Sequence, residues 1–200
     1  VANRIRGGEF HVNGRGYWLE RNDRGNCLHS GSAGYATKNF HIAAGGDDWV
    51  TLYWKDSAAE GFPGSVSLEV TYRVTEDDAL DIRYRLVPEE DTPVNLTNHA
   101  YFNLSGGRDA DVLNHELRLM ADFYTPAAPD MIPTGEIRKV EGTSLDFTGR
   151  RKLSEVLSET FGLDHNYVLR GSGYRKAAEL RHVESGRRME VYTDQPGIQI

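Results

Sequence analysis

Apolar and polar side chains alternate along most of the chain, and this period of two predicts β-strands rather than helices. The clearest example is a hairpin of residues 65–75 and 79–87, which Glu76-Asp77-Asp78 joins. Further elements are predicted at residues 9–19 (a short hairpin), 40–44, 49–54, 116–121, 166–169, 178–183, 189–193 and 197–200 (strands) and 153–160 (a helix). Short strands at intervals of roughly 8–12 residues, joined by hairpin turns, are typical of an antiparallel all-β sandwich or barrel.

The stretch Asn95–Leu104 is predicted to be a strand with one apolar and one polar face, since no glycine or proline interrupts it. Its polar face has a histidine at its centre, and its members are Asn95, Thr97, His99, Tyr101 and Asn103. A row of such groups suits a neutral ligand rich in hydroxyls, and the imidazole of His99 could transfer protons near neutral pH. A structural histidine bonded to its neighbours fits the pattern equally well, so both interpretations stand at this point.

Composition limits the classes of protein to which the chain can belong. Two hundred residues, 38% of them hydrophobic, suit one globular domain over residues 1–200. A net charge of −7, with basic residues scattered along the chain, argues against nucleic acid or an anionic membrane as a partner. The apolar runs, of a few residues each, are too short to span a bilayer. The single cysteine, Cys27, excludes an internal disulfide and favours a reducing, cytoplasmic location.

The sequence lacks the common motifs of nucleophilic, nucleotide and metal chemistry. It contains no Gly-x-Ser-x-Gly elbow, Walker loop, His-Glu-x-x-His or paired Cys-x-x-Cys. His29, His99 and His165 could be imagined as a metal trio, but no carboxylate at a recognisable spacing supports one. We therefore expect no metal site and no nucleotide cofactor.

Isolated polar residues at turns and strand ends are the remaining candidates for a site. Asn3 and Arg4 lie near a glycine pair, and His29 lies in a loop of small residues. Asp164 precedes an apolar strand, and Gln199 lies on the polar side of the last strand. Loops on a rigid scaffold often carry function. A surface turn, a backbone-bonded histidine, a turn cap and a solvated glutamine would explain these positions as well.

Six motifs, spread in order along nearly the whole chain, resemble those of the aldose 1-epimerases (galactose mutarotases). They are Ala2-Asn3-Arg4-Ile5, Leu28-His29-x-Gly31, Asn98-His99-x-Tyr101-Phe102-Asn103-Leu104, Ile132-Pro133-Thr134-Gly135-Glu136, Asp164-His165-Asn166-Tyr167 and Gln195-Pro196-Gly197-x-Gln199. The motif around His99 is the most diagnostic of the six. The resemblance therefore favours a functional role for that histidine.

What the resemblance implies is a large antiparallel β-sandwich of the galactose-mutarotase type, with a monosaccharide bound in an open cleft. The family interconverts the α and β anomers of free aldohexoses such as galactose and glucose, without metal or cofactor. By that resemblance His99 is the general acid that protonates the ring oxygen. The substrate hydroxyls would be held by Asn3, Arg4, His29, Asp164 and Gln199.

The chain departs from the family pattern in two respects. The family's glutamate base lies downstream of the Gln-Pro-Gly-x-Gln strand, and neither Glu136 nor Glu190 matches its motif. We therefore expect the domain to be incomplete at both ends, with the base beyond the end of this chain, and the 200-residue piece alone to be inactive. The milder departure is Ser30, which stands where a glycine is common.

Other functions remain open from the sequence. The same fold could serve as a non-catalytic sugar-binding or sugar-sensing module, since fold does not fix function. A phosphohexose 1-epimerase would need an extra basic cluster over the cleft, for which Arg4 and Arg6 are the candidates. A purely structural β-domain is a third alternative. We expect a monomer or a homodimer.

Overall fold

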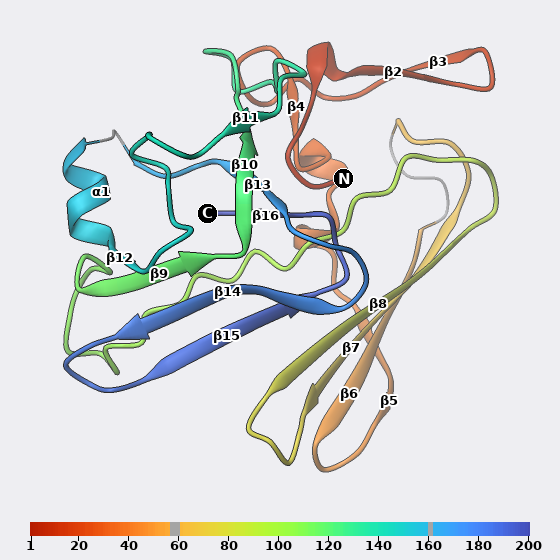
Figure 1. Ribbon diagram of the computed structural model, residues 1–200. Helices are drawn as coiled ribbons and strands as arrows, with labels where there is room; N and C mark the ends of the chain where they lie inside the picture. The colour runs from red at the N-terminus through yellow and green to blue at the C-terminus, as the bar shows by residue number, and fades with distance from the viewer. Residues whose placement is uncertain (57–60, 160–161) are drawn as a thin grey trace. The chain divides into compact units, whose positions relative to one another are not determined.

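A computed structural model describes residues 1–56, 61–159 and 162–200, and every strand pairing among these residues is antiparallel (Figure 1). The chain forms two compact units, Val1–Asn98 and His99–Ile200. The predicted all-β, antiparallel fold class is confirmed. The single domain expected over residues 1–200 stays a prediction.

The first unit contains a four-stranded antiparallel sheet of order β5-β6-β7-β8, together with the two-stranded pairs β1-β4 and β2-β3. Its strands are β1 (Arg4–Ile5), β2 (Glu9–Val12), β3 (Arg15–Trp18), β4 (Cys27–Leu28), β5 (His41–Gly45), β6 (Trp49–Asp56), β7 (Val66–Val74) and β8 (Leu80–Pro88), and its 3-10 helices are η1 (Arg6–Gly8), η2 (Gly31–Ala33) and η3 (Tyr35–Thr37). Alternation explains the central hairpin, because Val66, Leu68 and Val70 of β7 are buried while their neighbours are less so. The predicted hairpins at residues 9–19 and 65–87 are confirmed.

The second unit contains two four-stranded sheets, of order β11-β10-β13-β16 and β12-β9-β14-β15. Its elements are β9 (His115–Leu119), β10 (Ala121–Thr125), β11 (Arg138–Lys139), β12 (Arg151–Lys152), α1 (Leu153–Glu159), β13 (Asn166–Leu169), β14 (Arg175–His182), β15 (Arg188–Thr193) and β16 (Gly197–Gln199). The strand predicted at residues 116–121 is divided between the two sheets at Met120. The N–H of Met120 donates to the carbonyl of Ala177 in one sheet, and its own carbonyl accepts from the N–H of Arg170, which follows β13 of the other.

The core of the second unit lies between these elements and holds its largest buried side chains. Phe147 is 1% exposed and packs edge-on against Tyr167, with ring centroids 6.3 Å apart. The hydroxyl of Tyr167 donates to the carbonyl of Leu145 at 3.2 Å, and burial raises the pKa of this phenol. Since both the ring and its hydroxyl are accommodated, Tyr167 can be completely buried.

Helix α1 forms because it presents an apolar side to this core. Leu153 and Val156, three residues apart, are both buried there, and Glu155 lies in the first turn, where a carboxylate favours the helix dipole. The predicted helix is confirmed as far as Glu159, and Thr160 lies outside the described residues. At seven residues, this one α-helix of the described chain is too short to cross a membrane.

The predicted strand at Asn95–Leu104 is wrong. Residues 91–103, all of which are described, form neither helix nor strand, and Phe102, expected on the apolar face, is 48% exposed. The backbone groups at the end of this segment find other partners: the N–H of Leu104 donates to Nε2 of His115, and the N–H of Ser105 donates to Oδ1 of Asn103. A strand requires a neighbouring strand, and these local bonds replace one.

Candidate active site

The short pairing of β1 with β4 brings Asn3, Arg4 and His29 together in the first unit. Arg4 lies opposite Leu28 in this pairing, so Asn3 and His29 are the next residues on either strand. The N–H of His29 donates to the Asn3 carbonyl at 2.9 Å, and the N–H of Asn3 donates to Nδ1 of His29 at 3.1 Å. Because Nδ1 accepts a hydrogen bond, neutral His29 carries its hydrogen on Nε2.

Arg4 is oriented by a carboxylate that sequence reasoning missed. Its Nε donates to Oδ2 of Asp23 at 2.7 Å, and its Nη1 donates to Oδ1 of Asn3 at 3.3 Å. The arginine side chain is only 11% exposed, so its charge needs such a partner. Asp23 lies in a stretch without periodicity, and no pattern in the sequence marks it.

Two residues of this group, Asn3 and His29, and the adjacent Ser30 have left-handed backbone conformations. Their φ angles are +58° at Asn3, +52° at His29 and +66° at Ser30. Such values are uncommon outside glycine, and backbone strain of this kind tends to cluster at functional sites. The conformation of Ser30 also explains why glycine suits that position.

The pairing of β13 with β16 brings Asp164 and Gln199 together in the second unit. Asn166 lies opposite Gln199, and His165 and Ile200 exchange two backbone hydrogen bonds of 2.9 and 3.1 Å. Nε2 of Gln199 then donates to Oδ1 of Asp164 at 2.6 Å. Both side chains are exposed, so they can offer hydrogen-bonding groups to a ligand.

Three further residues lie beside this pair, and two of them, Tyr124 and Arg138, belong to none of the six sequence motifs. The rings of His165 and Tyr124 pack edge-on with centroids 5.9 Å apart, and Nη1 of Arg138 donates to the Tyr124 hydroxyl at 3.4 Å. Burial lowers the pKa of His165, and the Asp164 carboxylate opposes part of that shift. A half-buried neutral imidazole therefore lies next to the carboxylate.

Glu136 and Glu190, which do not match the motif of the family's base, are both ion-paired. Glu136 accepts two hydrogen bonds from Arg138, at 2.8 and 2.7 Å, and this pairing lowers the pKa of its carboxyl group. Glu190 is paired with Lys176 at 2.9 Å and accepts from the Tyr192 hydroxyl, which likewise lowers its pKa. A carboxylate with a lowered pKa is a weak base, so neither is suited to take a proton from a sugar hydroxyl.

His99 is exposed, and its ring packs at a tilt against Tyr101 with centroids 5.2 Å apart. The structure thus assembles two groups of predicted residues, one in each unit, and places His99 on an irregular segment at the start of the second unit. The roles of Asn3, Arg4, His29, His99, Asp164 and Gln199 toward a sugar stay predictions.

Solved structures of two sugar epimerases share this fold. The aldose epimerase homologue from C. elegans matches with a TM-score of 0.92 at 28% identity, over 100% of this chain and 62% of that one. The galactose 1-epimerase from Lactobacillus acidophilus matches with a TM-score of 0.76 at 25% identity, over 90% of this chain and 55% of that one. The fold is therefore that of the galactose-mutarotase class.

Sequence comparison then defines the family. The model of the aldose 1-epimerase family matches residues 1–200. The galactose mutarotase of Rattus norvegicus is 39% identical over 204 residues, and the aldose 1-epimerase of Escherichia coli is 34% identical over 207 residues. The chain belongs to the aldose 1-epimerase family. It spans 59% of the rat relative and 60% of the bacterial one.

Proposed function

We propose that the protein carrying this chain interconverts the α and β anomers of free aldohexoses such as galactose and glucose. The observation that carries the proposal is the match to the family model over all 200 residues, which includes every predicted site residue. The two polar groups support it, because they offer neutral and charged hydrogen-bonding atoms of the kind that bind sugar hydroxyls.

The chemistry is a ring opening by acid and base. His99 gives a proton to the ring oxygen while a carboxylate base takes the proton of the C1 hydroxyl. The bond between C1 and the ring oxygen breaks, and C1 becomes an aldehyde. Rotation about the C1–C2 bond and the reverse proton transfers close the ring with the other anomeric configuration. Each positioned acid or base of this kind contributes roughly 10²–10⁴-fold.

The remaining predicted residues would hold the sugar. Asp164 accepts hydrogen bonds from hydroxyls, Gln199 both donates and accepts, and Arg4, Asn3 and His29 donate from the other group. The charge of Arg4 is already balanced by Asp23 at 2.7 Å. A paired guanidinium favours a neutral hydroxyl over a phosphate, so we infer a free sugar rather than a phosphohexose as substrate.

Polarimetry tests this function. The longest natural chain that contains these 200 residues should hasten the optical drift of freshly dissolved α-galactose and α-glucose toward equilibrium. Galactose 6-phosphate should be a poorer substrate than galactose. Sugar binding without acceleration would instead favour a sensing module, and saturation by the phosphosugar alone would favour a phosphohexose enzyme.

Gly34 gives a second test, because it packs directly against the backbone of His29. A Cβ at Gly34 would lie 2.5 Å from the carbonyl oxygen of His29 and 3.1 Å from that of Gly31. Gly34→Ala should therefore displace the His29 loop, raise KM for galactose more than it lowers kcat, and reduce the free energy of unfolding by about 1–3 kcal/mol. Steady-state polarimetry and urea unfolding measure these effects.

Gly149→Ala is the matched control for this substitution. An added Cβ there meets no described atom within 4 Å, and the backbone of Gly149 is not left-handed. Its KM and its unfolding free energy should stay close to those of the unaltered protein. Equal KM values for Gly34→Ala and Gly149→Ala would contradict a substrate-binding role for the His29 loop.

A further inference from the structure

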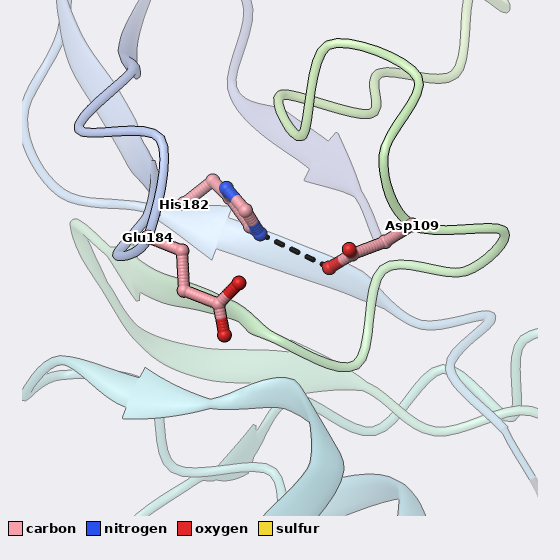
Figure 2. Close-up of side chains that lie close together, drawn as sticks. All are labelled: Asp109, His182 and Glu184. Atoms are coloured by element: carbon pink, nitrogen blue, oxygen red, sulfur yellow. Dashed lines mark hydrogen bonds and ion pairs between the residues drawn. The ribbon is translucent and has the colours of Figure 1, made fainter.

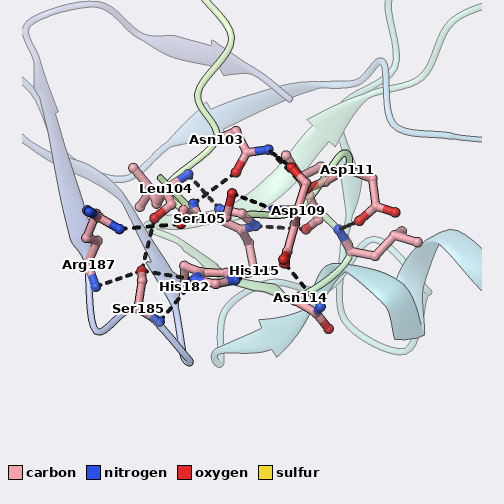
Figure 3. A network of polar contacts seen from close by, with 12 residues as sticks. Asn103, Leu104, Ser105, Asp109, Asp111, Asn114, His115, His182, Ser185 and Arg187 are labelled. Atoms are coloured by element: carbon pink, nitrogen blue, oxygen red, sulfur yellow. Dashed lines mark hydrogen bonds and ion pairs between the residues drawn. The ribbon is translucent and has the colours of Figure 1, made fainter. Parts of the chain in front are cut away.

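Two histidines of the second unit, outside the predicted site, are completely buried. His115 begins β9 and His182 ends β14, and they lie opposite one another in the strand pairing with ring centroids 4.8 Å apart. Figure 3 shows both rings within a network of polar contacts that reaches Asn103 and Leu104. Buried imidazoles are costly unless their ring nitrogens are hydrogen-bonded, so each nitrogen needs a partner.

The hydrogen bonds of His115 fix it as a neutral imidazole. The backbone N–H of Leu104 donates to its Nε2 at 2.8 Å, so this nitrogen is an acceptor. Its Nδ1 lies 3.1 Å from the carbonyl of Val112 and therefore carries the hydrogen. A second proton, on Nε2, would point at the N–H of Leu104, so that two donors would face each other.

Both ring nitrogens of His182 have partners. Nδ1 lies 2.9 Å from the hydroxyl oxygen of Ser185 and 3.2 Å from its backbone nitrogen, and Nε2 lies 3.1 Å from Oδ2 of Asp109. Figure 2 shows this contact together with Glu184, whose carboxylate lies near enough for the three side chains to hold a cation. Because Nε2 already lies at hydrogen-bond distance from Oδ2 of Asp109, a hydrogen-bonded pair accounts for this contact.

Both backbone groups of Leu104 are held by this network. His115 accepts from its N–H, and the hydroxyl of Ser185, beside His182, donates to its carbonyl at 3.0 Å. Asn103 closes the loop that follows, since its Nδ2 donates to the carbonyls of Asp109 and Asp111 at 3.0 and 3.1 Å. The segment that begins at His99 is thus anchored to the folded unit at Asn103 and Leu104 (Figure 3).

We propose that His115 and His182 are positioning residues for His99, acting through the fixed backbone of Leu104. This inference rests on the proposed role of His99 as general acid. Leu104 follows His99 by five positions, along a segment that forms neither helix nor strand. The attachment of Leu104 therefore restricts where His99 can lie. Catalysis depends strongly on such placement, because an error of about 1 Å can cost on the order of 10²-fold in rate.

The network should also depend on pH. Burial lowers the pKa of His115, the neighbouring His182 adds to this shift, and the carboxylates of Asp109 and Asp111 oppose it. The unfolded chain therefore binds this proton more readily than the folded one. The stabilisation is complete above the ordinary histidine pKa of about 6.5 and is lost as the pH falls below it.

The test compares two substitutions, each of which can keep a different one of the two hydrogen bonds of His115. His115→Gln can keep an acceptor for the Leu104 N–H, whereas His115→Asn keeps only the donor toward Val112. In the longest natural chain, His115→Asn should lower kcat by about 10–100-fold with KM nearly unchanged, and it should speed amide hydrogen exchange at Leu104. His115→Gln should recover most of both. His41→Asn, at an exposed histidine of β5, should change neither.

Each outcome decides the proposal. Fast Leu104 exchange with unchanged kcat in His115→Asn would overturn the positioning role, and unchanged exchange would overturn the contact itself. If His115→Asn does not fold, exchange in the unaltered protein still decides. After correction for intrinsic rates, protection of Leu104 should fall below about pH 6.5 and should not do so in His115→Gln. Exchange requires no catalysis, so activity retained by His99→Ala would separately overturn the role of His99 as general acid, on which this inference rests.

Discussion

Replacing His99 with alanine is expected to lower kcat for the anomerisation of α-galactose by about 10²–10⁴-fold, the usual contribution of a positioned acid. KM should change little, because the proposed sugar ligands lie elsewhere, in the Asn3–Arg4–His29 and Asp164–Gln199 groups. The ring of His99 is exposed, so its removal leaves no cavity and the fold should persist. Polarimetry over a range of sugar concentrations separates kcat from KM.

His41→Ala is the matched control for His99→Ala. His41 is also exposed, and it lies on β5, at the edge of the first unit's four-stranded sheet. Its replacement should leave kcat unchanged. If His99→Ala retains more than about half of the activity, His99 is not the acid. His165, a half-buried imidazole beside Asp164, would then be the next residue to replace.

Phe147→Ala should produce the largest loss of stability among single substitutions in the second unit, about 3–5 kcal/mol of unfolding free energy. The ring is 1% exposed and packs against Tyr167 within the core, so its removal leaves a cavity there. Urea unfolding followed by far-ultraviolet circular dichroism measures the change.

Phe123→Ala isolates the effect of burial from the effect of removing a phenyl ring. Phe123 lies on β10 and is 36% exposed. Its replacement should cost less than about 1.5 kcal/mol, because much of its ring already contacts solvent. Equal losses at the two positions would show that Phe147 is not at the centre of the core.

Alternation was sufficient to predict the longer strands of this fold. Residues 66–74 and 80–88 form the predicted hairpin, because apolar residues alternate along both strands and a polar turn joins them. Burial follows the alternation at Val66, Leu68 and Val70 of β7. Helix α1 was predictable from the helical spacing of Leu153 and Val156. The sequence therefore predicts an element correctly where the spacing of its own apolar residues determines the structure.

The segment around His99 shows where that reasoning fails. Its residues favour a strand by local preference, but Leu104 bonds to an imidazole eleven positions later rather than to a neighbouring strand. The side chain of Asn103, expected to face a ligand, closes a loop instead. Neither bond has a periodic signal, because each depends on how distant parts of the chain meet.

For the candidate site, the sequence named residues whose roles stay predictions, and it indicated only some of the contacts that the structure shows among them. The motifs named Asn3, Arg4 and His29. In the structure Asn3 and His29 share one backbone hydrogen bond and one from the Asn3 N–H to the His29 ring, and Arg4 donates to the Asn3 side chain. The motifs did not name Asp23, which orients Arg4 at 2.7 Å. A charge partner of this kind is determined by the folded loop, and the sequence around Asp23 has no pattern that marks it.

Met120 has a consequence for how the length of this chain can change. It is the single residue between β9 and β10, which belong to different sheets. Its N–H is bonded to Ala177 of one sheet, and its carbonyl is bonded to Arg170 beside the other. An insertion or deletion here would turn every following side chain of β10 to the opposite face. Tyr124 would leave the core, and its ring would no longer pack on His165. Natural variation in chain length should therefore be excluded from this corner and accommodated in exposed loops such as residues 171–174.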